Sequence, residues 1–84
     1  MNKSESYELL IGEMKSISDL AKTEIDEYIN KTIESNVSSE NGTLYTVEIK
    51  VTKKENNTYT VNGTVHNNSS YKYELLEETL VVEK

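Results

Sequence analysis

The side chains that could take part in acid–base chemistry are a single histidine and several carboxylates. His66 has no Ser, Cys or second His at a spacing that forms a recognisable catalytic set with it. It falls on the polar face of a predicted strand, so we expect a surface residue. The pairs Asp26–Glu27 and Glu77–Glu78 are adjacent in the sequence, so their side chains diverge on a helix or a strand. We therefore predict no catalytic residue and a protein that is not an enzyme.

Metal and phosphate sites are not predicted either. Calcium loops place Asp, Asn and Gly at fixed alternating positions, and the segment Ser39–Gly42 is too short to supply them. The glycines stand too far apart to form a phosphate-binding loop. The absence of Cys leaves neither a thiolate ligand nor a disulfide. We expect no cofactor and no metal.

The charge of the chain argues against direct binding of nucleic acid. The 15 acidic residues outweigh 9 basic ones, giving a net charge of -6 at pH 7, and none of the basic residues is Arg. Phosphate would be repelled overall. We interpret the acidic residues as a solubilising surface, or as a surface that imitates phosphates and so inhibits a host factor. This candidate acidic surface comprises Glu13, Asp19, Glu24, Asp26, Glu27 and Glu34.

The residue bias points to an AT-rich genome, because Arg, Pro and Ala are encoded largely by GC-rich codons. The chain lacks Arg, Pro, Trp, Phe and Cys, whereas Asn, Lys, Ile and Glu are abundant. We expect a microbial or phage origin. The first residues lack an apolar signal-peptide core, and no apolar run approaches the roughly 20 residues that cross a bilayer. We therefore expect a cytoplasmic protein without membrane association.

A long amphipathic helix is predicted over residues 4–36. Apolar side chains recur at spacings of three and four, which places them on one stripe of a helix. We expect this stripe to face the core, with charged residues on the opposite side and a stop in residues 36–42. The stripe comprises Tyr7, Leu10, Ile11, Met14, Ile17, Ser18, Ala21, Ile25, Tyr28, Ile29 and Thr32.

Three strands are predicted over residues 44–53, 58–66 and 71–83. Apolar and polar residues alternate along them, the pattern of a sheet with one buried face and one wet face. The predicted fold class is α+β: one long N-terminal amphipathic helix packed on one face of a three-stranded antiparallel meander (α-β-β-β), with a bulged, extended C-terminal strand. One domain spans residues 1–84. The predicted inward residues are Tyr45, Val47, Ile49, Val51, Tyr59, Val61, Gly63, Val65, Tyr71, Tyr73 and Leu75.

The parity of the alternation sets the register of the hairpins. A two-residue loop at Asn56–Asn57 would place inward residues opposite outward ones, so we exclude it. An odd-length loop pairs Val51 with Val61, or slips this pairing by two residues. The expected second hairpin pairs Gly63 with Tyr73, and we interpret Gly63 as a bend that this aromatic ring covers.

The helix and the C-terminal strand both extend past the predicted sheet. The alternation changes parity after Leu75, which indicates a bulge near residues 76–78, and Leu80–Val82 then have no strand beneath them. A helix of about 30 residues is roughly 45 Å long, against roughly 27 Å for the strands. Either the tail curls under the helix within one chain, or two chains share these surfaces as a homodimer, which we favour. The candidate interface comprises Tyr7, Leu10, Ile11, Met14, Leu76, Leu80 and Val82.

The function predicted from these features is that of a non-enzymatic protein-interaction or regulatory protein. We expect it to form a homodimer and to bind a protein partner, with inhibition of a host factor as one such role. The alternative is a small-ligand-binding domain, with a pocket between helix and sheet lined by tyrosine hydroxyls.

Overall fold

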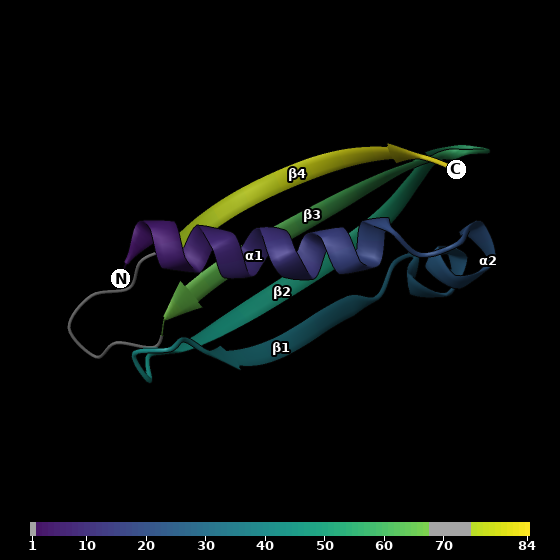
Figure 1. Ribbon diagram of the computed structural model, residues 1–84. Coiled ribbons are helices and arrows are strands. Elements are labelled where there is room, and N and C mark those ends of the chain that lie inside the picture. Colours follow the sequence, from purple (N-terminus) through teal and green to yellow (C-terminus); the bar gives the residue numbers. More distant parts are fainter. Residues whose placement is uncertain (1, 68–74) are drawn as a thin grey trace.

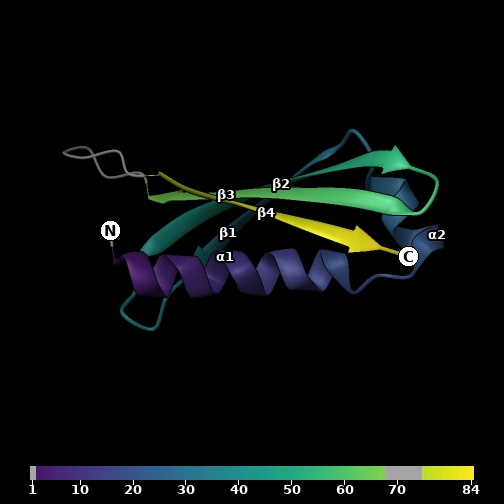
Figure 2. The ribbon, with the colours of Figure 1, turned by 90° about the horizontal axis from the view of Figure 1, so that it is seen from above.

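The computed structural model describes residues 2–67 and 75–84, which form one helical layer on one antiparallel sheet. Helix α1 lies across one face of the sheet (Figure 1), and the view turned by 90° separates the two layers (Figure 2). The α+β class and the antiparallel sheet behind an N-terminal helix are therefore confirmed. The elements are α1 (Lys3–Ser18), α2 (Lys22–Ile25), the 3-10 helix η1 (Asp26–Tyr28), β1 (Thr32–Ser38), β2 (Leu44–Glu55), β3 (Thr58–Asn67) and β4 (Leu75–Glu83), and the strand order is β1-β2-β3-β4.

Helix α1 begins and packs as its sequence favours. The side chain of Asn2 caps the helix by accepting a hydrogen bond of 3.1 Å from the backbone N–H of Glu5. The buried residues Ser6, Leu10, Met14 and Ser18 recur every four residues and so form one stripe against the sheet. The two serines fit this stripe because their hydroxyls donate to backbone carbonyls of the preceding turn.

The predicted helix over residues 4–36 was wrong in its second half. Helix α1 ends at Ser18, and residues 32–38 form β1, a fourth strand at the edge of the sheet. The predicted stripe ended at Thr32, whereas Ile33 and Val37 lie on the inward face of β1. Ser35, the inward residue between them, is polar, and this hid the period of two. With 16 residues, or roughly 24 Å, α1 has no overhang beyond the sheet.

The hairpin of β2 and β3 has the expected pairing but an unexpected loop. Val51 lies opposite Val61, as predicted. However, Glu55 pairs with Thr58 around Asn56–Asn57, the two-residue loop that parity had excluded. A register shift between Lys53 and Glu55 supplies an extra residue on β2, and this bulge restores the parity.

Strand β4 pairs with β3 along its full length and contains no bulge. The register runs without interruption from His66 opposite Leu75 to Thr58 opposite Glu83. Gly63 therefore faces Glu78 rather than Tyr73, and the predicted second hairpin was wrong. Tyr71 and Tyr73 themselves lie outside the described residues.

The even-numbered residues of β4 face the core, as the apolar pattern of its C-terminal half indicates. Leu76, Leu80 and Val82 pack against the core, whereas Leu75 is exposed. The tail is thus supported by β3, and Leu80 lies opposite Val61. The predicted inward position of Leu75 was wrong because the segment before it had set the parity.

The core lies between α1 and the two central strands, and Gly63 sets its thickness. A Cβ atom at Gly63 would lie 2.7 Å from Sδ of Met14 and 2.8 Å from Cδ1 of Leu10. The absence of a side chain here lets α1 approach β3, and it is the helix rather than an aromatic ring that covers this glycine. The fully or almost fully buried apolar residues are Leu10, Met14, Ile25, Tyr45, Val47, Ile49, Val51, Tyr59, Val61 and Val65.

Substitution of Gly63 tests this close approach. We expect Gly63→Ala to lower the free energy of unfolding by about 1–3 kcal/mol, because the added methyl overpacks the contact with Leu10 and Met14. The matched control is Gly12→Ala in α1, where a Cβ meets nothing within 4 Å. This control should raise stability by about 0.5–1 kcal/mol through its higher helix propensity. Urea unfolding of both variants measures the difference, and equal effects at the two glycines would contradict the packing argument.

Candidate functional site

Three tyrosine hydroxyls connect the helical layer to the sheet by donating to carboxylates. Each bond joins a strand to a helical segment, and the two bonds made by α1 are 3.0 Å long. A buried tyrosine ring needs a partner for its hydroxyl at the rim of the core, and a carboxylate is a strong acceptor. The pairs are Tyr7–Glu78, Tyr45–Glu5 and Tyr59–Asp26.

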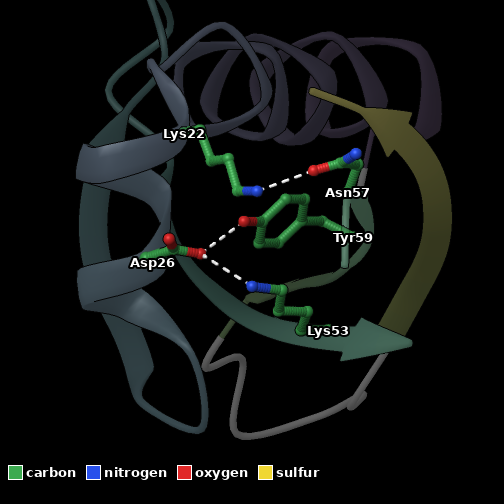
Figure 3. A network of polar contacts seen from close by, with 5 residues as sticks. All are labelled: Lys22, Asp26, Lys53, Asn57 and Tyr59. Carbon is green, nitrogen blue, oxygen red and sulfur yellow. Dashed lines mark hydrogen bonds and ion pairs between the residues drawn. The ribbon is translucent and has the colours of Figure 1, made fainter. Parts of the chain in front are cut away.

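The third pair belongs to a larger polar cluster at the α2 end of the molecule, the Asp26 network (Figure 3). Asp26 on η1 accepts from the hydroxyl of Tyr59, and the Nζ atom of Lys53 lies 3.7 Å from the same carboxylate oxygen. Lys53 also lies 5.5 Å from the centre of the Tyr59 ring, a cation–π contact. Nearby, Lys22 donates to the side-chain oxygen of Asn57 over 2.6 Å. These contacts fix α2 and η1 to the β2–β3 hairpin.

The pKa shifts of these three tyrosines suit a structural role rather than acid–base catalysis. Hydrogen bonding to Asp26, followed by burial, raises the pKa of Tyr59 to about 12. The hydrogen bond to Glu78 raises the pKa of Tyr7, and burial followed by the bond to Glu5 raises that of Tyr45. All three phenols are therefore held protonated at neutral pH, where they act as hydrogen-bond donors.

The six residues of the candidate acidic surface do not share one face. Glu13 lies on α1, and Asp19, Glu24 and Glu27 are exposed around α2 and η1. Asp26 is engaged by Tyr59 and Lys53, as described above. Glu34 lies on β1 opposite Glu48, on the sheet face that points away from α1. The predicted common surface depended on one continuous helix, and the end of α1 at Ser18 separates its members.

The candidate interface residues come together at the β4 edge, but two of them are fully buried. Leu10 and Met14 are 0% exposed, on the face of α1 that packs on the sheet. Tyr7 is 42% exposed, and Ile11 lies one turn further along α1. Strand β4 runs along α1, from Glu78 beside Tyr7 to Lys84, whose ammonium donates to the carbonyl of Ser18 at the end of the helix. The structure thus has the arrangement within one chain. We call the partly exposed group the β4 rim: Tyr7, Ile11, Leu76, Leu80 and Val82.

The edge of β4 carries backbone groups that are directed away from β3. The N–H of Lys84 donates to the carbonyl of Asn57 over 2.8 Å, so even-numbered residues of this strand bond to β3. Odd-numbered residues then point their N–H and C=O groups outward. The contact of Thr79 agrees, because its N–H donates to the Glu78 side chain over 3.1 Å. The edge therefore presents backbone groups beside the apolar β4 rim.

The space between α1 and the sheet is filled by the core side chains, so a ligand there would have to displace them. The hollows lie at the surface instead. One, of about 440 Å³, is lined by Lys3, Ser4, Tyr7, Glu8 and Leu76 beside the β4 rim. Another, of about 290 Å³, lies on the polar face of the sheet and is lined by Glu48, Lys50, Asn62, Thr64 and Glu77.

Comparison with known proteins gives no family to which the site could be related. No protein-family model matches the chain, and no curated protein or solved structure matches it. Within residues 2–67 and 75–84, no group of three or more His, Cys, Asp or Glu residues could hold a metal ion. None of the described helices has the length and apolar character needed to cross a membrane.

Sequence reasoning found the members of the β4 rim but missed how they are arranged. The tyrosines were expected in the core, and their carboxylate partners were not identified, because the partners lie up to 71 positions away in the sequence. The outward direction of the odd-numbered β4 backbone groups depends on pairing with β3. No pattern of residue types signals that direction.

The raised pKa of Tyr59 predicts a loss of stability in alkali. The unfolded phenol titrates near the ordinary value of 10, whereas the folded one titrates at about 12. The stabilisation is complete below pH 10 and is lost as the pH rises from 10 to 12, because the unfolded chain releases its proton first. We expect Tyr59→Phe to be less stable than wild type at pH 8 and to approach it above pH 10.

Urea midpoints of wild type, Tyr59→Phe and Asp26→Asn at pH 8, 10 and 11 measure this effect. Asp26→Asn keeps an acceptor oxygen but removes the charge, so its midpoint should depend on pH less steeply than that of wild type. A constant difference between wild type and Tyr59→Phe over this range would show that the hydrogen bond does not account for the pH dependence.

Proposed function

We propose that this protein is a non-enzymatic protein-interaction protein that takes an extended strand of a partner at the edge of β4. The observation that carries the proposal is the outward direction of the odd-numbered N–H and C=O groups of β4, beside the partly exposed β4 rim. Strand addition uses such groups for affinity and neighbouring apolar side chains for specificity. Both features are present along the nine residues of β4.

The composition of β4 suits this role better than that of β1, the other edge strand. Protected edges carry charged side chains, above all Lys, or Pro, bulges or short strands. Strand β4 carries Glu77, Glu78 and Glu83, but it has no Lys or Pro between Leu75 and Glu83, its register is uninterrupted, and Val81 is 65% exposed. Strand β1 is shorter, and Asn36 and Ser38 at its end are polar. The edge of β4 is thus the more favourable of the two for pairing.

The strand that pairs with β4 could come from either of two proteins expected from the sequence. In the homodimer it comes from a second copy of this chain. In the inhibition of a host factor it belongs to that factor. Contact through the β4 edge replaces contact through a continuous acidic surface, since the six acidic residues are separated.

Site-specific photo-crosslinking in the cell from which the gene comes tests the proposal. A photoreactive residue at Val81, on the β4 edge, should give protein adducts at least several-fold above those from Thr32 on β1. The edge is then blocked with Glu77→Pro, which removes an outward N–H that does not bond to β3. The matched control, Glu77→Thr, keeps this N–H.

We expect the adducts to disappear with Glu77→Pro and to persist with Glu77→Thr. Circular dichroism and thermal melts of both variants establish that each is folded. Equal adducts from Val81 and Thr32, or adducts that survive Glu77→Pro in a folded protein, would refute strand addition at β4.

A further inference from the structure

We propose that the strand added to β4 is β4 of a second copy, paired antiparallel on a two-fold axis at Thr79. This inference rests on the proposed function, in which the β4 edge takes a protein strand. It names the partner and fixes the register of the pairing.

The backbone of β4 permits this symmetry. Thr79 is an odd-numbered residue whose N–H is directed away from β3 and donates to the Glu78 side chain. A two-fold axis perpendicular to the sheet places Thr79 opposite Thr79 of the second copy, where the two residues exchange N–H···O=C bonds. The same symmetry pairs the outward backbone groups of all the remaining odd-numbered residues from Leu75 to Glu83.

The positions of the glutamates favour this register over the two registers with the axis one residue away. With the axis at Thr79, Glu77 faces Val81 and Glu83 faces Leu75 of the second copy. An axis at Leu80 would place Glu77 opposite Glu83, and an axis at Glu78 would place that residue opposite itself. Like charges directly opposite are destabilising in a sheet.

An axis at Val81 avoids these clashes but pairs less of the strand. It leaves residues 75–78 past the C-terminal end of the second copy's β4, so that they pair with no residue of that strand. The axis at Thr79 pairs the whole of β4, from Leu75 to Glu83, without opposing two glutamates. This difference favours the register at Thr79.

The side chains on the α1 side fit the same register. Leu76 lies opposite Val82 of the second copy, and both are partly buried hydrophobic residues at the margin of the core. The hollow lined by Tyr7, Lys3, Ser4, Glu8 and Leu76 adjoins this position. Since the axis is perpendicular to the sheet, both α1 helices lie on one side, and the two β4 rims become continuous.

Glu78 is the residue that pairing must displace. One carboxylate oxygen accepts from the Thr79 N–H and the other from the hydroxyl of Tyr7. In the pair, the Thr79 N–H passes to the carbonyl of the second copy, and Glu78 faces Leu80. The Glu78 side chain therefore competes with the second strand for the central hydrogen bond.

Cysteine scanning tests the register, and the absence of native Cys gives a clean background. In the proposed pair the Cα atoms of the two copies of residue 79 lie about 5.5 Å apart, within disulfide range. Those of residue 75 lie roughly 27 Å apart, because eight residues of strand separate them. Thr79→Cys should therefore form a disulfide-linked dimer under mild oxidation at least tenfold faster than Leu75→Cys. Val81→Cys reports the competing register.

Sedimentation of the reduced variants and of wild type establishes that they fold and associate alike. Wild type should sediment as a dimer of the 9.6 kDa chain at micromolar concentrations, and Glu77→Pro as a monomer. Equal oxidation rates at positions 79 and 75, or a faster rate at 81, would overturn the register. A wild-type dimer that Glu77→Pro does not dissociate would place the interface elsewhere.

The two proposals fail in different ways. If wild type is a monomer and Val81 crosslinks to another protein, strand addition holds and the second copy is excluded as the occupant. If wild type is a monomer and Val81 gives no adduct, both proposals are wrong.

Discussion

The close approach of α1 to Gly63 is the constraint on which the rest of the structure depends. Leu10 and Met14 reach complete burial because the central strand has no side chain beneath them. With the helix this near, the tyrosines of β2 and β3 extend past its sides, and their hydroxyls arrive at the rim of the core. The same position places α1 alongside β4, where Tyr7 donates to Glu78 and Lys84 donates to the carbonyl of Ser18.

The three tyrosine–carboxylate bonds explain both the tyrosine content and part of the acidic composition. The chain has six tyrosines and no Phe or Trp, so its aromatic core residues all carry a polar end. At the rim, each hydroxyl in these bonds takes a carboxylate from another element, and a charged acceptor makes the stronger hydrogen bond. Some of the acidic residues thus hold the two layers together. They are not free to form an external surface.

The parts of the fold that could be predicted are those with an unambiguous period. Strands β2 and β3 alternate strictly, so their inward faces and their mutual pairing followed from parity. Residues 32–38 were predicted wrongly because the polar Ser35 separates Ile33 from Val37 and so interrupts the apolar alternation of the strand. The exclusion of a two-residue loop at Asn56–Asn57 was wrong because a bulge adds one residue to β2 and so restores the parity that this loop alone would break. Such choices depend on tertiary contacts that a single sequence does not state.

The candidate interface was likewise predictable only in part. Its residues were grouped by the need to cover apolar side chains of the helix, and β4 meets that need within the chain. What is left exposed is a backbone edge, which composition alone does not reveal. In the proposed antiparallel pair, Glu77 and Glu83 would favour the register that does not place two glutamates opposite each other. The Glu78 side chain accepts a hydrogen bond from the Thr79 N–H, the group that the proposed second strand would engage. The proposed association therefore depends on the glutamates of β4 more than on the six residues of the candidate acidic surface.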